Sequence, residues 1–330
     1  MKNSMNKTAP TLLTLMIIVL GGYLIYQVIY NPIIVSFVPT PQPGIERLRN
    51  INGNGRFLWS PTEMMIIGSS TNFGPCPDWG CSQESEIFLV DLETHKKKTI
   101  YKIDQYGFHI IGWSSDGKRI LVSVEGEGVL ATGIWSMDFE EPGPPEFITD
   151  RTLAAWSYDG TKMAVADFID EPGGKYPVID VVDLETGQKR QVFKASMPSS
   201  IWSLSWSADG KQIAFLHYDQ KPNIYVLQLE TREITQIASN ESAYDDGVFS
   251  PQDNLIALKK SSQGYEDSVV IKDLFNDCQV EMPVEKVKLL GSWSPDGRRF
   301  AFSTYDDDVY IVDLGKFLGF DFQKTGSLCP

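Results

Sequence analysis

Short apolar runs alternate with polar turns through most of the chain, and this alternation predicts β-strands rather than long helices. An Asp-Gly pair at Asp116-Gly117 separates two such runs, and it supplies the positive φ that tight hairpin turns need. The strands predicted around it cover residues 108–113, 119–124, 133–137 and 147–149. This stretch is therefore expected to fold as a four-stranded meander.

The same unit recurs six times, each copy marked by an aromatic-Ser phrase followed by a second apolar phrase. The marker residues are Trp59, Trp113, Trp156, Trp206, Phe249 and Trp293. A unit of this size cannot bury its apolar faces alone, so the repeat predicts a toroidal or solenoidal β architecture. We expect the marker rings to pack between neighbouring units, because a stacking function would not need six related copies.

Six signatures predict an all-β, six-bladed β-propeller over residues 45–314. The last copy reaches only its third strand at Leu314, whereas an unassigned strand at residues 45–51 precedes the first copy. We expect this N-terminal strand to complete the last blade, because closure of the ring removes exposed sheet edges. The tail of residues 315–330 is expected to pack against the outside or the base of the ring.

Two stretches give the repeat a family resemblance. Residues 293–303 read Trp-Ser-Pro-Asp-Gly-Arg-Arg-Phe-Ala-Phe-Ser, residues 309–314 read Val-Tyr-Ile-Val-Asp-Leu, and the form recurs at 206–215 with 224–229. The chain resembles the TolB-type β-propeller repeats, which are related to WD repeats, over residues 45–314. The resemblance implies the fold but not the function, because such propellers serve as binding modules, peptidase gates and sensors.

The N-terminal region predicts a membrane anchor. Residues 8–45 contain no charged side chain, and residues 12–30 form an apolar run that would span roughly 28 Å as a helix. We assign residues 1–10 to a cytoplasmic N-terminus, 11–30 to a transmembrane signal-anchor helix and 31–44 to a proline-rich stalk. Lys2 and Lys7 precede the run, which places the propeller outside the cytoplasm. A cleaved secretory signal is the alternative, although no small-residue cleavage site ends the run.

Charge and cysteine content narrow the possible partners. A net charge of −14 and a pI near 4.7 leave no basic stripe for phosphates, so no nucleic-acid partner is expected. The four cysteines fit an oxidising compartment. We predict a local disulfide between Cys76 and Cys81, and a second between Cys278 and Cys329 that would tie the tail to the body. A zinc site is the alternative, but the Cys-x4-Cys spacing is loose and no nearby histidine completes it.

Catalytic signatures are missing from the sequence. The histidines His95, His109 and His217 fall in different units, and there is neither a Gly-x-Ser-x-Gly motif nor a glycine-rich phosphate loop that follows a strand. We interpret the paired acids as a solvated rim, with a carboxylate-based hydrolase or a calcium site as alternatives. These pairs are Glu140-Glu141, Asp170-Glu171, Asp245-Asp246 and Asp306-Asp307-Asp308. We expect no enzyme activity, cofactor or metal.

The loops between the second and third strands supply the candidate binding residues. In a propeller they all emerge on one face, and most of them carry an aromatic residue beside an acid. The predicted partner-binding surface at the channel mouth comprises Trp79, Tyr176, Tyr218, Tyr265, Tyr305 and Asp306. Rings that only cover strand ends against solvent are the alternative.

These features favour a membrane-anchored, non-catalytic scaffold that binds another envelope or membrane protein or a peptide. A receptor or sensor for a small ligand such as a saccharide is the alternative, and a hydrolase is the third possibility. The channel separates these hypotheses. A dry, narrow channel favours protein binding, whereas an aromatic-walled pocket of roughly 300 Å³ or more with convergent carboxylates favours a ligand or catalysis.

Overall fold

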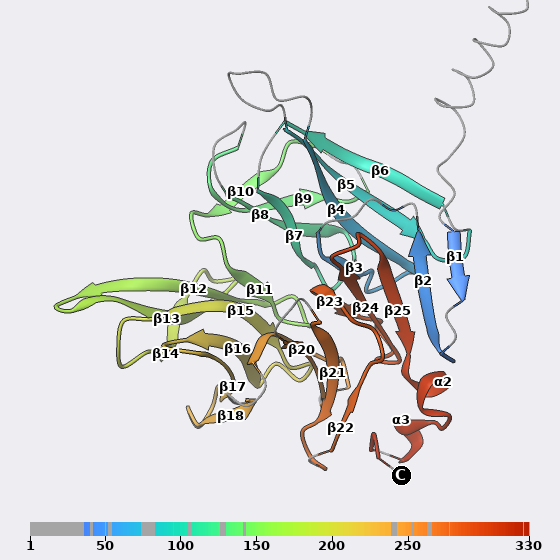
Figure 1. Ribbon diagram of the computed structural model, residues 1–330. Coiled ribbons are helices and arrows are strands. Elements are labelled where there is room, and N and C mark those ends of the chain that lie inside the picture. The colour runs from blue at the N-terminus through green and yellow to red at the C-terminus, as the bar shows by residue number, and fades with distance from the viewer. Residues whose placement is uncertain are drawn as a thin grey trace, which may run out of the picture.

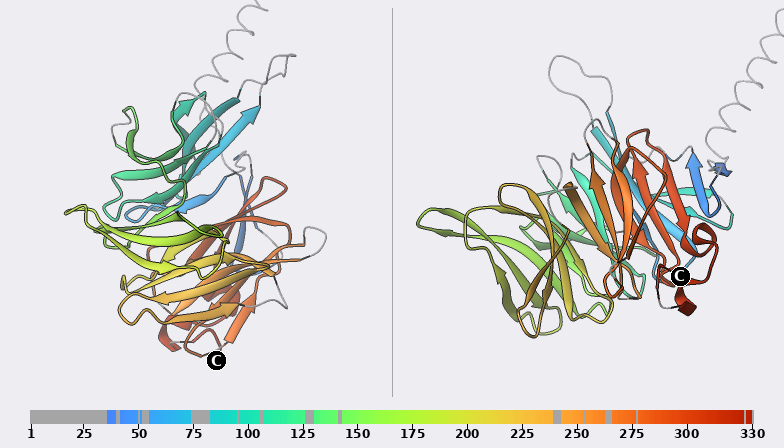
Figure 2. Two further views of the ribbon diagram at one scale, coloured as in Figure 1. Left: turned by 90° about the vertical axis from the view of Figure 1, so that its left-hand side faces the viewer. Right: turned by 60° about the horizontal axis from the view of Figure 1, so that its bottom comes forward.

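Six antiparallel sheets surround a central channel, and each sheet corresponds to one repeat of the sequence (Figure 1, Figure 2). In the first five sheets, the four strands are hydrogen-bonded in chain order, with the first strand of each blade lining the channel. This computed structural model describes residues 36–39, 42–49, 51, 55–73, 83–94, 96–104, 107–125, 130–140, 143–238, 243–252, 254–262, 266–276, 278–325 and 327–329.

The first three blades use twelve strands. Blade one contains β3 (Phe57–Trp59), β4 (Met65–Phe73), β5 (Gln83–Asp91) and β6 (Lys96–Ile103). Blade two contains β7 (Phe108–Trp113), β8 (Arg119–Val124), β9 (Gly133–Asp138) and β10 (Glu146–Thr149). Blade three contains β11 (Ala154–Trp156), β12 (Lys162–Glu171), β13 (Gly174–Asp183) and β14 (Lys189–Lys194).

The last three blades follow the same plan, with one exception in blade six. Blade four contains β15 (Ser200–Trp206), β16 (Gln212–Tyr218), β17 (Pro222–Gln228) and β18 (Ile234–Ala238). Blade five contains β19 (Ala243–Phe249), β20 (Leu255–Ser261), β21 (Ser268–Asp273) and β22 (Cys278–Glu281). Blade six takes β23 (Val287–Trp293), β24 (Arg299–Thr304) and β25 (Val309–Asp313) from the end of the repeats.

Blade six is completed from the other end of the chain. Strand β2 (Ile45–Arg49) pairs antiparallel with β25, and Arg47 forms an ion pair with Asp308. Figure 1 shows this blue strand beside the red end of the chain. The predicted six-bladed, all-β propeller and its closure by the N-terminal strand are confirmed. A further strand that the sequence did not predict, β1 (Ser36–Pro39), lies in the segment expected to be a stalk and pairs with β2.

The predicted hairpin turns are held by a repeated hydrogen-bond motif. In blade two, Ser114 Oγ donates to Asp116 (2.6 Å), which also accepts a backbone N–H two residues later, while Gly117 has a φ of +70°. The same serine–aspartate hydrogen bond forms in the hairpin turns of blades three, four and six. The bond from Ser114 is the main cause of the lowered pKa of Asp116, so the turn favours the charged carboxylate. In blades one and five, Ser60 and Ser250 accept backbone bonds instead.

Each junction between neighbouring blades has its own hydrophobic cluster of buried side chains. This is what a repeat array requires, because one blade buries its apolar faces only against the next. Among the described residues, the cluster between blades two and three is the smallest, and its buried members are Leu121, Ile134, Ala154, Met163 and Val165. The junction of blades two and three is therefore the least extensively packed.

The tail folds back against blades five and six. Helix α2 (Leu314–Leu318) begins directly after β25, where the Asp313 side chain accepts the backbone N–H of Lys316, and α3 (Phe322–Thr325) follows. Phe322 and Leu328 are buried in the cluster shared by these two blades. The tail therefore extends the hydrophobic core at this junction.

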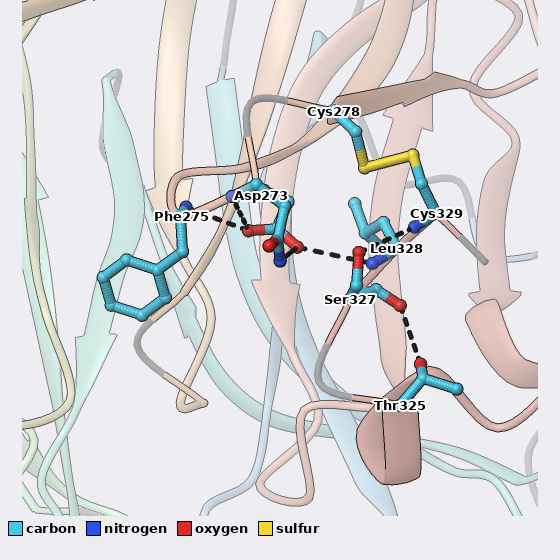
Figure 3. The surroundings of a disulfide bond; sticks show 8 residues. Asp273, Phe275, Cys278, Thr325, Ser327, Leu328 and Cys329 are labelled. Carbon is cyan, nitrogen blue, oxygen red and sulfur yellow. Dashed lines mark hydrogen bonds between the residues drawn. A yellow bond between two sulfur atoms is a disulfide. The ribbon is translucent and has the colours of Figure 1, made fainter.

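A disulfide fixes the end of the tail to blade five (Figure 3). It joins Cys278, the first residue of β22, to Cys329, with Cα atoms 6.4 Å apart. Nearby, the fully buried Asp273 accepts the backbone N–H of Leu328 (3.3 Å). Burial acts to raise the pKa of Asp273, but hydrogen bonds, chiefly from Asn276, outweigh it and lower that pKa. The disulfide and the hydrogen bond from Leu328 therefore hold the end of the tail against blade five.

Several sequence predictions fall on residues that the structure does not describe. The transmembrane helix at 11–30, the cytoplasmic segment at 1–10 and the predicted Cys76–Cys81 disulfide all lie outside the described ranges. Within those ranges, no helix combines the length and apolar character needed to cross a bilayer. The anchor, the external location and the local disulfide therefore stay predictions.

Candidate functional site

The six marker aromatic residues end the inner strands at one face of the ring. We call this the hairpin face, because it carries the turns between the first and second strands of each blade; the opposite face, with the loops between second and third strands, is the loop face. Trp113 and Trp156 are half-buried. The other four rings are buried, namely Trp59, Trp206, Phe249 and Trp293. The predicted structural role of these rings is therefore compatible with their burial.

Two of these tryptophans link neighbouring blades by hydrogen bonds. Trp206 Nε1 donates to the carbonyl of Ala155 in blade three (2.9 Å). Trp293 Nε1 donates in the same way to Val248 in blade five (3.0 Å). Each indole thus satisfies its own polar group while its ring fills the junction, which is the arrangement expected of a structural tryptophan.

A cavity of about 370 Å³ lies in the channel at the hairpin face. Trp113, Trp156 and the exposed Tyr158 contribute aromatic surface to it. Aliphatic surface comes from Leu58, Ile111, Leu204 and Val248. The cavity meets the size and aromatic lining expected of a ligand pocket, but its described lining includes no carboxylate. It also lies at the opposite end of the channel from the predicted partner surface.

Five serines of the cavity wall already have hydrogen-bond partners within the propeller. Ser205 and Ser292 each accept a backbone N–H from the next blade, at 2.9 and 2.8 Å. Ser60, Ser114 and Ser157 bond within their own hairpin turns. The wall therefore offers a ligand mainly apolar and aromatic surface.

Among the described residues that line the cavity, one is cationic. Arg56, which immediately precedes β3, donates from Nη2 to Asp246 of β19 (2.7 Å), so the ion pair joins blades one and five. The Asp246 side chain is 8% exposed, whereas that of Arg56 is 31% exposed. The guanidinium therefore remains accessible while its partner is buried. The sequence placed Asp246 only in an acidic pair and did not indicate Arg56.

Tyr158 lies at the mouth of this cavity. Its hydroxyl donates to the carbonyl of Phe249 in blade five (3.3 Å), and the residue is 41% exposed. Tyr158 follows a Trp-Ser phrase, at a position where the other five units have small residues. These are Pro61, Ser115, Ala208, Pro251 and Pro295. The single large side chain at this position therefore extends across the mouth.

Other accessible side chains stand on the inner strands closer to the loop face. Trp202 is 65% exposed at a bulge in β15, and it departs from the repeat as a second tryptophan four residues before the marker. His109 on β7 is also exposed. Although its side chain is accessible, His109 lies among surrounding blades that limit the hydration of its ring, and this mainly lowers its pKa; Glu125 opposes this effect, whereas Arg56 and Lys288 add to it. Sequence reasoning did not indicate Trp202.

The predicted partner surface is described only in part. Tyr218 ends β16 and is 44% exposed, and Tyr305 follows β24, where a lysine Nζ of blade five lies 6.0 Å from its ring centroid. Tyr176 lies on the β12–β13 hairpin, which projects beyond the neighbouring strands (Figure 1). Trp79 and Tyr265 lie outside the described residues. Three of the five rings thus come from blades three, four and six, and the surface stays a prediction.

The acidic run at 306–308 is neutralised by neighbouring cations. The ion pairs are Asp306 with Lys286 (3.1 Å), Asp307 with Lys288 (3.9 Å) and Asp308 with Arg47. Each of the three carboxylates therefore has a cationic partner within the propeller. In the part of the chain that the structure describes, no three His, Cys, Asp or Glu side chains form a group that could hold a metal ion.

Comparison with solved structures finds TolB and other propellers. A TolB-type protein from Agrobacterium tumefaciens is 20% identical, with a TM-score of 0.56, over 68% of this chain and 79% of that chain. TolB from Acinetobacter baumannii is 18% identical, with a TM-score of 0.55, over 87% of this chain and 66% of that chain. An oligogalacturonate lyase in complex with manganese is 13% identical, with a TM-score of 0.53, over 86% and 97%.

At these identities, the likeness shows the β-propeller fold alone. It agrees with the TolB-like resemblance of the repeats. No protein-family model matches the chain, and no curated protein matches it.

Proposed function

We propose that this chain is a non-catalytic binding scaffold that captures another envelope or membrane protein or a peptide. The observation that carries the proposal is that the described lining of the aromatic cavity at the hairpin face includes no carboxylate, while five of its six serines already bond within the propeller. Such a wall presents apolar surface for contact. A rigid ring with an accessible aromatic recess is a common way to anchor a partner.

The proposal includes a location. Residues 11–30 would anchor the chain in the membrane, with the propeller on the outer side, because lysines precede the apolar run and no charge interrupts it. The disulfide between Cys278 and Cys329 supports this placement, since such bonds persist in oxidising compartments.

A receptor for a small ligand is the second candidate, and the volume of the cavity favours it. At about 370 Å³, the cavity falls at the small end of ligand pockets. A saccharide is a poorer fit than an apolar ligand, because a sugar needs many polar partners and five wall serines already have hydrogen-bond partners within the propeller. The likeness to oligogalacturonate lyase reaches the fold only, so a hydrolase or lyase is not proposed.

Site-specific photo-crosslinking tests the scaffold proposal and identifies the face used. A photoreactive phenylalanine analogue replaces Tyr158 at the hairpin face, Tyr218 at the loop face, or the 80% exposed Phe275 as a control. The full-length chain is crosslinked in its native membrane, and adducts are identified by mass spectrometry. We expect a discrete protein adduct from Tyr158 and none from Phe275. An adduct from Tyr218 alone would move the site to the loop face, and no adduct from either would refute the scaffold.

A further inference from the structure

The cavity at the hairpin face combines aromatic walls with one accessible cation. Trp113, Trp156 and Tyr158 supply the exposed ring surface, and Arg56 supplies the charge. A planar apolar group gains most from such walls, because ring faces and edges pack closely against one another. The cavity is therefore shaped for a ring rather than for an extended polar chain.

Arg56 adds a requirement for an acceptor on the ligand. Among the described residues it makes one hydrogen bond, from Nη2 to Asp246, and the rest of its donor fork is uncommitted. A guanidinium carries five N–H donors and binds carboxylates in a bidentate geometry. Because the chain as a whole carries a net charge of −14, a local cation in the channel is a specific feature and not part of a general basic surface.

The two contacts that cross the channel limit the size of the ligand. The Arg56–Asp246 pair joins blades one and five on the inner side of the cavity, and Tyr158 reaches the carbonyl of Phe249 at its mouth. The volume of the cavity, about 370 Å³, suits one compact molecule better than a chain that threads the ring.

We propose that this cavity binds a compact aromatic carboxylate, with the ring among Trp113, Trp156 and Tyr158 and the carboxylate on Arg56. The proposal rests on the small-ligand candidate for the function of this cavity, and it names the chemistry of that ligand. Asp246 then competes with the ligand for the same guanidinium, so removal of its charge strengthens binding.

The probe pair is N-acetylphenylalanine and its amide, which differ by the carboxylate. Binding to the purified full-length chain in detergent is followed by the tryptophan emission of the protein with excitation at the red edge, where phenylalanine does not absorb. We expect the acid to bind about 10-fold or more tightly than the amide, as charge-assisted hydrogen bonds imply. Equal affinity, or no binding of either, would overturn the proposal.

Two variants act in opposite directions. Arg56→Gln should abolish the preference for the acid, whereas Asp246→Asn should increase affinity for the acid and leave the amide unchanged. Lys211→Gln is the matched control, because Lys211 is an exposed cation on the hairpin face whose ion-pair partner among the described residues is the neighbouring Asp209. Melting curves of each variant establish that it is folded. Loss of acid binding in Asp246→Asn with an unchanged melting curve would contradict competition for Arg56.

Two further outcomes separate this inference from the scaffold proposal. Photo-crosslinking to a protein from position 158 with no binding of the acid would retain the scaffold and sink the small-ligand inference. A peptide that ends in phenylalanine is compared with N-acetylphenylalanine in the same assay. If the peptide binds more tightly, the ligand is the C-terminus of a polypeptide and not a small carboxylate, which would also overturn the inference.

Discussion

Removal of the Cys278–Cys329 disulfide should measurably destabilise the propeller, because this bond closes a long loop of the chain. The bond closes a loop with a sequence separation of 51 residues. In the chain-entropy treatment, a loop of this length corresponds to about 4 kcal/mol of stabilisation, because the bond restricts the unfolded chain. The double variant Cys278→Ala/Cys329→Ala removes the bond and leaves no unpaired thiol at either position.

The expected result is a fall in Tm of about 5–10 °C for a chain of this size. The assay is thermal unfolding of the full-length protein in detergent, followed by near-UV circular dichroism and limited proteolysis. Wild-type protein treated with a reductant is the matched control. It should reproduce the Tm of the double variant, provided that the remaining cysteines make a small contribution.

A Tm within about 1 °C of the wild type, with the tail still resistant to protease, would refute the entropic reasoning. That result would mean that buried Phe322 and Leu328 hold the tail without covalent help. An unchanged Tm with early cleavage after α2 would show that the tail opens locally before the ring unfolds.

Two further predictions concern the ring itself. Trp206→Phe should lower the free energy of unfolding, measured by chemical denaturation, by about 1–2 kcal/mol more than Trp113→Phe. The reason is that Trp206 loses its hydrogen bond to the Ala155 carbonyl, whereas the buried Nε1 of Trp113 has no partner among the described residues. Equal losses would contradict the proposed role of that bond. Burial lowers the pKa of His217, whose ring is hydrogen-bonded to Ser199. The neutral ring therefore contributes stability that is fully present above the ordinary histidine pKa of 6.5 and is lost as the pH falls through the lowered pKa of the folded state. His217→Phe should therefore reduce the drop in Tm between about pH 7.5 and pH 5.5, and an unchanged drop would assign that pH dependence to other groups.

The sequence predicts the propeller well because its signals are local. The Asp116-Gly117 turn and the aromatic residue before each turn lie within a few residues of the strands they define. Closure by β2 also follows, because a missing fourth strand and a spare strand leave one economical solution. Strand β1 escaped prediction because the four prolines of residues 31–44 suggested an unpaired segment.

The cavity could not be predicted in the same way. Arg56 and Asp246 are 190 positions apart and meet only because the ring brings blades one and five together. Tyr158 is visible in the sequence as a large residue at a position of small ones, but its reach to the Phe249 carbonyl depends on the curvature of the ring. The sequence predicts a packing role for the marker tryptophans, which agrees with the burial and hydrogen bond of Trp206, yet these tryptophans also line the cavity.

The construction of blade six has a consequence for synthesis of the protein. β2 leaves the ribosome about 260 residues before β25, its hydrogen-bonding partner, so at about 5–20 residues per second it waits roughly 10–50 s. During that time, each newly made blade has a neighbour on one side only, and its uncovered apolar face is open to misassembly. A nascent chain stalled before β25 therefore carries five blades that cannot form a ring, and it is the species that a chaperone would have to protect.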